Sequence, residues 1–476
     1  MSTTLGGTRQ ASAPGIDKVV SSLVARARAA QRRYEAYSQE QVDEVVTAAG
    51  WAIVDPEHNR VLAELAVATT GLGNVADKIS KNRRKTMGLL RDLAGARSVG
   101  VISEDKARGL VEIARPVGVV GAVVPSTNPA ATPANNIINA LKGRNAIILS
   151  PSPKGSPTST KLLEYVHAEL DRVRAPRDLV QQIPAPVTRE MTAELMRRVD
   201  LVVATGSQNN VRAAYSSGTP AIGVGAGNVV VIVDASADLG DAARKIGESK
   251  MFDNATSCSS ENAVVILDAV YDAMIEALRK QGGVLLDPAE KARLQNAMWR
   301  EGKLSPSIIA RSAADIARVA GLDRCADASF LMVEETGAGP EYPFSGEKLS
   351  PVLTVYRARD FDHAVALAGD INEYEGAGHS IGIHTADDAQ AMRLGLEFPV
   401  CRVIVNQAHC FANGGNFDNG LPFTLSMGCG TWGRNSISDN LNYRHFLNIT
   451  RIARVIRENE PSEEDLFGSY RAKYGL

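Results

Sequence analysis

Val117-Gly-Val-Val-Gly-Ala-Val-Val124 is an unbroken apolar run, and the polar turn Pro125-Ser-Thr-Asn-Pro129 follows it directly. An apolar run of this length between turn residues predicts a buried strand. Helical spacing resumes over residues 136–142, and a second apolar run, Ala146-Ile-Ile-Leu149, comes next. Strand, turn, helix and strand in this order predict a parallel β-α-β unit, and therefore an α/β fold.

The same pattern repeats further along the chain. Residues 199–204 predict a third strand, Thr205-Gly206-Ser207 forms a short turn, and residues 210–215 predict a helix. Free amides at such a helix start can hold a phosphate, although many α/β turns of this kind bind no nucleotide. No complete G-x-G-x-x-G motif occurs at this strand end, so a dinucleotide site needs support from elsewhere in the sequence.

Length, charge and cysteine spacing limit the possible classes of protein. A chain of 476 residues exceeds a single hydrophobic core and predicts two domains. The 52 Lys plus Arg nearly balance the 54 Asp plus Glu, so neither nucleic acid nor a membrane surface is an expected partner. No secretion signal or membrane span is predicted. The five cysteines are scattered without C-x-x-C spacing, so we expect no disulfide framework, no metal site and a cytoplasmic location.

Two domains and a returning C-terminal segment are predicted. Residues 14–97 have helical periodicity, and residues 98–116 predict a protruding β-hairpin with Gly109 in or near its turn. A strand-like run over residues 446–454 is expected to pair across a subunit interface. The predicted boundaries are 1–234 for a dinucleotide-binding domain, 235–430 for a catalytic domain, and 431–476 for the C-terminal return segment and oligomerisation strand.

One thiol lies in the stretch Met251-Phe-Asp-Asn-Ala-Thr-Ser-Cys-Ser-Ser-Glu-Asn262. A helix predicted over residues 239–252 ends there, and the strand-like run 263–267 follows. A polar loop between a helix and a strand presents the Cys258 thiol on a rigid scaffold, which suits a nucleophile. Taken alone, an unpaired cysteine is more often a small buried hydrophobe, but the hydroxyl groups around this one favour a polar pocket.

Two further segments have alternative interpretations. The basic run Lys81-Asn-Arg-Arg-Lys85 is of a kind that usually forms a solvated helix face; the alternative is contact with an anionic substrate or a cofactor phosphate. The loop over residues 407–421 is rich in Gly and Asn. We expect it to border a pocket, because long irregular loops inside compact enzymes are usually functional.

Several motifs occur in a characteristic order and spacing. They are R-P-V-G-V-V-G-A-V-V-P-S-T-N-P from Arg115, A-T-G-S from Ala204, A-A-Y-S-S-G-T-P-A-I-G-V-G-A-G-N from Ala213, F-D-N-A-T-S-C-S-S-E from Phe252, E-K-L-S-P-V-L from Glu347, G-H-S-I-G-I-H from Gly378 and M-G-C-G-T-W-G-R-N-S-I-S-D-N from Met427. With them the chain resembles the aldehyde dehydrogenases, more narrowly their CoA-acylating branch, over essentially its whole length. The resemblance implies a Rossmann-type cofactor domain, an α/β catalytic domain and a small oligomerising hairpin.

The resemblance also implies a chemistry, with Cys258 as the nucleophile. Its thiolate attacks the aldehyde carbon, and the oxyanion of the thiohemiacetal accepts hydrogen bonds from the Cys258 backbone amide and the Asn128 side chain. Without the resemblance, Asn128 before a proline reads as a turn residue. Loss of hydride to the nicotinamide leaves an acyl thioester. Glu347 matches the carboxylate that holds the nicotinamide ribose; otherwise it is a surface charge before a strand.

An absence indicates the fate of the thioester. Hydrolytic relatives activate water with a glutamate in E-L-G-G, whereas the matching stretch here, Gly223-Val-Gly-Ala226, has no carboxylate. A thiol needs less assistance than water as a nucleophile, so the expected product is an acyl-CoA. His379 is a candidate base for the incoming thiol, although a structural histidine is the more common case.

A dinucleotide site is implied in the same way. In hydrolytic relatives a Lys and a Glu after the second strand contact the adenine ribose, and that Glu disfavours a 2′-phosphate. Here the stretch is Ser150-Pro-Ser-Pro-Lys154, with one base and no acid, which favours NADP without excluding NAD. The expected cofactor-binding residues are Pro125, Ser126, Ser150, Ser152, Lys154, Thr205, Gly206, Ser207, Gly223, Val224, Gly225, Glu347 and Leu349.

The aldehyde pocket is expected to be polar. Its expected residues are Ser257, Ser259, His409, Cys410 and Phe411, which favour a small polar or anionic aldehyde. The whole sequence most resembles acylating sulfoacetaldehyde dehydrogenases, which implies conversion of sulfoacetaldehyde to sulfoacetyl-CoA by a homodimer or homotetramer. Acetaldehyde or succinate semialdehyde as substrate, a hydrolytic reaction, and a catalytically silent binding or structural role are the alternatives.

Overall fold

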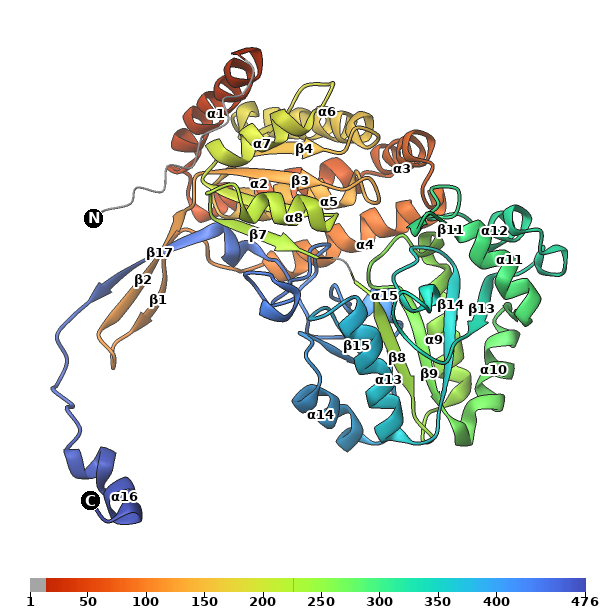
Figure 1. Cartoon of the computed structure of the whole chain (residues 1–476). Coiled ribbons are helices and arrows are strands. Elements are labelled where there is room, and N and C mark those ends of the chain that lie inside the picture. The colour runs from red at the N-terminus through yellow and green to blue at the C-terminus, as the bar shows by residue number, and fades with distance from the viewer. Residues whose placement is uncertain (1–13, 226) are drawn as a thin grey trace, which may run out of the picture.

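A computed structural model describes residues 14–225 and 227–476, and its first domain is built on a five-stranded parallel sheet (Figure 1). Every residue of its central strand is buried, which explains the unbroken apolar run in the sequence. The predicted β-α-β order is confirmed. In spatial order the strands are β5 (Val180–Gln182), β4 (Ala146–Pro151), β3 (Val119–Val124), β6 (Leu201–Thr205) and β7 (Ala221–Val224).

Helices cover this sheet, and four of them come from the N-terminal region that the sequence predicted as helical. Ser38 caps α2 in a capping box, and Asn74 caps α4 by accepting the Asp77 amide. The helices are α1 (Pro14–Tyr34), α2 (Gln39–Val54), α3 (Pro56–Thr70), α4 (Val75–Leu93), α5 (Ala131–Lys142), α6 (Ser156–Arg172), α7 (Arg189–Arg198) and α8 (Gln208–Tyr215).

The second domain contains a seven-stranded parallel sheet. Its order is β10 (Gly283–Leu285), β13 (Phe330–Glu334), β14 (Val352–Ala358), β9 (Glu261–Leu267), β8 (Val229–Val233), β15 (Ile381–His384) and β16 (Val403–Val405). Strand β8 pairs with β9 and β15. The first domain was expected to run through residue 234, which would place β8 at its C-terminal end. Strand β8 lies in the second sheet instead, so the boundary between the two sheets falls between Val224 and Val229.

Helices and a short ribbon complete the second domain (Figure 1). They are α9 (Leu239–Met251), α10 (Tyr271–Lys280), α11 (Pro288–Met298), α12 (Ala313–Ala320), α13 (Phe361–Tyr374), α14 (Asp388–Glu397) and α15 (His409–Ala412), with the ribbon β11 (Trp299–Arg300) and β12 (Lys303–Leu304). The chain then returns to the first domain, where Phe423, Leu441 and Phe446 join the core.

The predicted hairpin protrudes from the body as β1 (Gly100–Asp105) and β2 (Leu110–Pro116), with Gly109 at a positive φ of 64° in its turn (Figure 1). The tail strand β17 (Leu447–Ala453) pairs antiparallel with β2 of the same chain. Its expected pairing across a subunit interface is therefore replaced, along this edge, by pairing within the chain. Helix α16 (Glu463–Tyr474) extends beyond this arm.

None of the helices in the described ranges combines the length and the apolar character that crossing a bilayer requires.

Candidate active site

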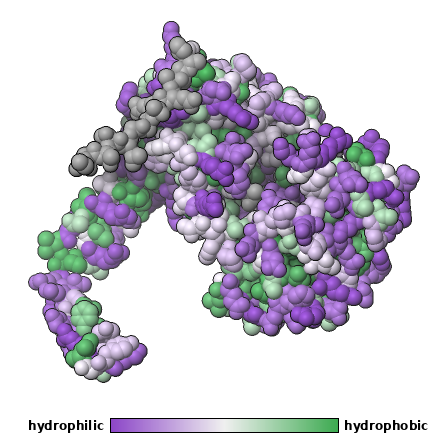
Figure 2. Space-filling view, in the orientation of Figure 1, coloured by the Kyte–Doolittle hydropathy of each residue, from purple (hydrophilic) through white to green (hydrophobic). Residues whose placement is uncertain are grey.

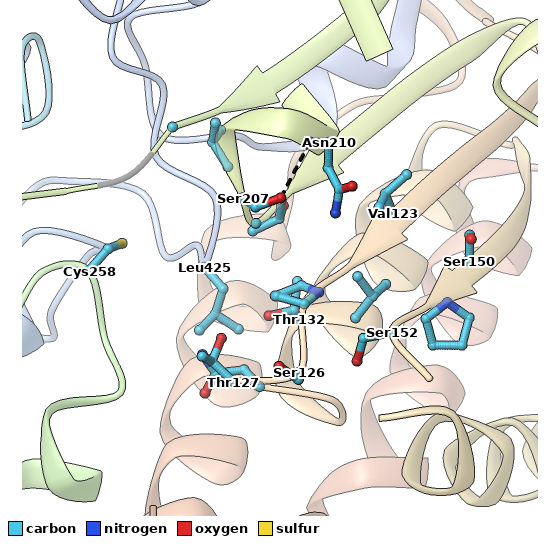
Figure 3. Close-up of a pocket in the computed structure, with 18 of the residues that line it drawn as sticks. Val123, Ser126, Thr127, Thr132, Ser150, Ser152, Ser207, Asn210, Cys258 and Leu425 are labelled. Atoms are coloured by element: carbon cyan, nitrogen blue, oxygen red, sulfur yellow. Dashed lines mark hydrogen bonds between the residues drawn. The ribbon is translucent and has the colours of Figure 1, made fainter. Parts of the chain in front are cut away.

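A cavity of about 950 Å³ lies between the two domains, where the strands of the first sheet end. The carboxyl ends of β3, β4, β6 and β7 all supply lining residues. Ligands of open α/β sheets bind at this edge. Figure 3 shows Cys258 at one end of the cavity and Ser150 and Ser152 toward the other, with Thr127 and Ser207 between. The cavity is thus long enough to separate a reacting thiol from a distant binding region.

Most residues predicted for the site line this cavity, but four do not. The lining includes Pro125, Ser126, Asn128, Ser150, Ser152, Thr205, Gly206, Ser207, Val224, Gly225, Ser257, Cys258, Ser259, Glu347, Leu349 and Cys410. The predicted residues outside it are Lys154, Gly223, His409 and Phe411. Within the described residues, no cluster of three or more His, Cys, Asp or Glu could hold a metal ion.

The Cys258 thiol is presented by an abrupt change of chain direction. Helix α9 ends at Met251, Asp253 and Asn254 both adopt a φ of 52°, and β9 begins at Glu261. The half-buried Cys258 side chain points into the cavity (Figure 3). Burial, with the nearby Glu347 and Cys429, raises the pKa of the Cys258 thiol to about 12. At neutral pH the group is a thiol, and it has to lose its proton before it can attack.

Asn128 is held by a lysine that the sequence interpretation placed in solvent. Lys81 is 6% exposed, and its Nζ donates to Asn128 Oδ1 at 3.0 Å, Asp253 Oδ2 at 2.6 Å and Thr256 Oγ1 at 3.0 Å. Lys78 also donates to Asp253 Oδ2, at 3.0 Å. A lysine can only donate, so the amide oxygen of Asn128 faces Lys81 and its NH2 group remains available.

The expectation of a solvated face is therefore wrong for much of the basic run. Lys85, on the same helix, is 7% exposed and lines the cavity, with its Nζ donating to the Gly414 carbonyl at 2.7 Å. Arg84 is half-buried, and only Arg83 faces solvent. Helix α4 packs between the two domains, so its lysine face meets the nucleophile loop instead of water.

The distal part of the cavity fits a dinucleotide. Ser207 caps α8 by accepting the Asn210 amide at 3.4 Å (Figure 3), and Gly206 before it has a φ of 144°. This leaves backbone donors at a helix start for a phosphate. Glu347 lines the cavity, and its Oε1 is enclosed without a hydrogen-bond partner. A buried oxygen without a donor is costly, and a ribose hydroxyl would satisfy it.

The charged residues around the predicted dinucleotide site differ in part from those expected from the sequence. Burial and Glu375 raise the pKa of Glu347 to about 8. Lys154, expected near the adenine ribose, is exposed and is not among the residues that line the cavity. Arg189, at the start of α7, lines the cavity together with Ser150 and Thr192, whose hydroxyls lie 2.8 Å apart. Sequence reasoning missed Arg189 because it follows a different strand from Ser150.

Gly223 has neither a side chain nor space for one. A Cβ added here would lie 2.5 Å from Val211 Cγ1 and 2.9 Å from the Tyr215 ring. Gly223 also donates its amide to the Tyr215 hydroxyl at 3.0 Å. The position that matches the water-activating glutamate of hydrolytic relatives is thus occupied by neighbouring side chains.

The two candidate histidines are buried and do not line the cavity. His409 is fully buried, its Nδ1 donates to the Ser259 carbonyl at 3.0 Å, and burial lowers its pKa to about 3. The N–H of the neutral ring is already used by the Ser259 carbonyl and the ring lies outside the cavity lining, so its prediction as a pocket residue is wrong. Phe411 instead packs edge-on against Phe252. His379 is buried behind Gly227, with its pKa held well below the usual value by burial.

Comparisons with known proteins agree with this geometry. Residues 4–321 match the aldehyde dehydrogenase family. The chain is 62% identical over 460 residues to a sulfoacetaldehyde dehydrogenase (acylating) of Cupriavidus necator, covering 96% of this chain and 93% of that protein. An acetylating aldehyde dehydrogenase structure from Geobacillus thermoglucosidasius superposes with a TM-score of 0.90 at 35% identity, covering 94% and 99% of the two chains.

A third similarity concerns the acyl acceptor. A Rhodopseudomonas palustris propionaldehyde dehydrogenase structure, with bound CoA and an acylated cysteine, superposes with a TM-score of 0.83 at 25% identity, covering 92% of this chain and 97% of that one. The predicted fold and the resemblance stated from sequence motifs are confirmed. This chain belongs to the aldehyde dehydrogenase family, in the branch of its acylating members.

Proposed function

We propose that the protein oxidises sulfoacetaldehyde and transfers the acyl group to CoA, giving sulfoacetyl-CoA, with NADP preferred over NAD as electron acceptor. The arrangement of the site carries this function. Cys258 shares a cavity with Asn128, whose amide oxygen is held by Lys81. The position that could carry a water-activating carboxylate is Gly223, which has no side chain and no space for one. The 62% identity to the Cupriavidus necator enzyme supports the choice of aldehyde.

The first step is addition of the thiol to the aldehyde. After Cys258 gives up its proton to solvent, its Sγ bonds to the aldehyde carbon and the C=O electron pair moves to oxygen. The Asn128 NH2 group and the Cys258 backbone amide donate to that oxyanion, and preorganised donors of this kind stabilise the developing charge. Asp253 and Thr256 hold Lys81, and therefore Asn128, in place, and Lys78 in turn donates to Asp253.

The second step converts the adduct to a thioester. The carbon gives up its hydrogen with two electrons, which a nicotinamide ring bound in the cavity would accept. We assign Glu347 to the nicotinamide ribose, because its enclosed oxygen lacks a donor, and Gly206, Ser207 and Gly225 to the close approach of the cofactor backbone. Leu349, Val224, Thr205, Pro125 and Ser126 also line the cavity.

The third step passes the acyl group to CoA. The CoA thiolate attacks the thioester carbon, the bond to Cys258 Sγ breaks, and acyl-CoA leaves. No carboxylate stands at Gly223 to activate water against the same carbon. A thiol needs less activation than water, so the thioester has time to meet CoA.

The test is dinucleotide reduction by the purified protein with sulfoacetaldehyde, acetaldehyde or succinate semialdehyde, each with and without CoA. We expect CoA-dependent turnover that is fastest with sulfoacetaldehyde and NADP. Equal turnover without CoA would assign a hydrolytic reaction instead, and a better rate with another aldehyde would replace the substrate.

We also propose that the protruding arm joins copies of this chain into a homodimer or homotetramer. Figure 2 shows hydrophobic side chains along the arm and α16; the exposed ones include Val101, Ile452, Leu466, Phe467 and Tyr470. Exposed apolar surface of this kind marks an interaction site. Light scattering should show an oligomer that Ile452→Asp weakens, and a monomeric wild-type protein would contradict this.

For the location of the protein we propose the cytoplasm. The cysteines are all free, which supports a reducing compartment.

A further inference from the structure

Lys85 is a buried cation without an anionic partner. The neighbouring lysines of α4 are neutralised, since Lys78 and Lys81 both form ion pairs with Asp253. Among the residues that the structure describes, no carboxylate forms an ion pair with Lys85. Removing an ammonium from water is costly unless a counter-charge compensates it. Burial, with Arg84 and Lys81 nearby, accordingly lowers the pKa of Lys85 to about 7.

The ammonium lies at the reactive end of the cavity. Its Nζ is 2.7 Å from the point where a Cβ on Gly414 would stand, and that point is 3.5 Å from Met427 Sδ. Met427 in turn accepts a hydrogen bond from the Ser259 hydroxyl at 3.4 Å, one residue from the nucleophile. Lys85, Cys258, Gly414 and Met427 all line the same cavity.

The hydrogen bonds of Lys85 leave room for a ligand. The ammonium carries three N–H donors, and one is used by the Gly414 carbonyl. The ammonium also lies 5.5 Å from the centroid of the Phe423 ring. Thr256 and Thr424 also line the cavity, but their hydroxyls already donate to Asp253 Oδ2 and to the Ser426 carbonyl, so the ammonium itself is the donor that a ligand would meet. A bound anion would therefore meet the Lys85 ammonium, and Glu347, the carboxyl group that lines the same cavity, is mostly protonated at neutral pH because its pKa is raised to about 8.

We propose that Lys85 binds the sulfonate group of the aldehyde substrate and so makes the enzyme specific for an anionic aldehyde. The identity of the bound group as a sulfonate rests on the proposed function. The anion site itself is inferred from the buried Lys85 ammonium, which has no carboxylate partner among the described residues. Sulfoacetaldehyde has a single methylene between its sulfonate and its carbonyl carbon. A cation close to the nucleophile can hold the sulfonate while the carbonyl carbon faces Cys258. A neutral aldehyde gains nothing from the same contact.

The decisive variant is Lys85→Met, which keeps much of the side-chain volume and removes the charge. We expect kcat/KM for sulfoacetaldehyde to fall about a hundredfold, the typical loss when one partner of a buried charge pair is truncated. Turnover of acetaldehyde with CoA should change less than about threefold, and Lys85→Arg should retain part of the sulfoacetaldehyde activity. The matched control is Arg83→Met, which removes an exposed cation from the same helix; both activities should be unchanged.

Two outcomes would overturn the assignment. Equal loss with both aldehydes would mean that Lys85 only holds the loop at Gly414, and no loss with either would place the sulfonate elsewhere. Ethanesulfonate separates this test from the proposed function, since it needs no turnover. It should protect Cys258 from N-ethylmaleimide in the wild type and in Arg83→Met, but not in Lys85→Met. Protection without sulfoacetaldehyde turnover would keep the anion site and remove only the proposed substrate; no protection of the wild type would remove the site.

Discussion

Lys81 Nζ lies 3.0 Å from Asn128 Oδ1 and fixes which end of the Asn128 amide faces the cavity. The two residues are far apart in the sequence, on α4 and after β3. Asp253, fully buried and also bound by Lys78, anchors the Lys81 ammonium at 2.6 Å. The orientation of the Asn128 amide, an oxyanion donor, therefore depends on α4, which lies outside the sequence motifs that contain Asn128 and Cys258.

Lys81→Met should lower kcat with little change in KM, because a free amide can rotate its oxygen toward the oxyanion. Losing an oxyanion donor outright lowers kcat about a hundred- to a thousandfold, so a misoriented one should cost roughly ten- to a hundredfold. The variants Lys81→Met, Asn128→Ala and their combination form a cycle. The double variant should be no slower than Asn128→Ala alone. Additive losses would show that Lys81 acts independently of Asn128.

The Cys258 thiol should be alkylated slowly near neutral pH in the free enzyme. With its pKa raised to about 12, the thiolate fraction, and so the rate with iodoacetamide, should rise roughly tenfold per pH unit without a plateau below pH 10. A plateau near pH 8 would contradict this.

Glu347→Gln should accelerate that alkylation only at high pH. The Glu347 pKa is raised to about 8, so below that pH the carboxyl is protonated in the wild type and the variant should react at the same rate. Above it the carboxylate opposes the Cys258 thiolate, and its removal should speed the reaction severalfold. Identical pH profiles would show that the carboxylate does not influence the thiol.

Gly223→Glu should not create a hydrolytic enzyme. A Cβ at this position meets Val211 and Tyr215, and overpacking of this kind costs about 1–3 kcal/mol. We expect a lower melting temperature and no CoA-independent dinucleotide reduction. Gly223→Ala separates packing from charge, because it should lower the melting temperature without adding a carboxylate. A stable variant with CoA-independent turnover would disprove the packing argument.

Arg189→Ala should reduce the preference for NADP. Arg189 is the cation that lines the cavity beside Ser150, and a 2′-phosphate contacting an exposed arginine should gain a tenfold advantage at most, since solvent screens the pair. The KM for NADP should therefore rise up to about tenfold while that for NAD stays constant. Lys154→Ala is the matched control, since Lys154 is exposed outside the cavity. An effect of Lys154→Ala alone would restore the sequence-based assignment.

The sequence by itself determined the β-α-β succession that forms β3, β4 and β6 of the first sheet, the thiol between a helix and a strand, and the missing carboxylate at Gly223. These features are local, because a buried parallel strand requires a continuous apolar run and a nucleophile loop requires its own residues. Even so, β8 was assigned to the wrong sheet, since an apolar run does not reveal which strands it will pair with.

Only the tertiary structure decided which charges are buried. The lysines of α4 have the spacing of a solvated face, yet Lys81 and Lys85 are covered by segments around Asp253 and Gly414, far along the chain. The reverse holds for Lys154, which was expected in the cofactor site and is exposed to solvent. His409 was expected to line the pocket and is instead fully enclosed. The exposure of a side chain depends on which other segments pack against its helix or strand. Those segments are distant in the sequence, so the residues around the side chain do not reveal them.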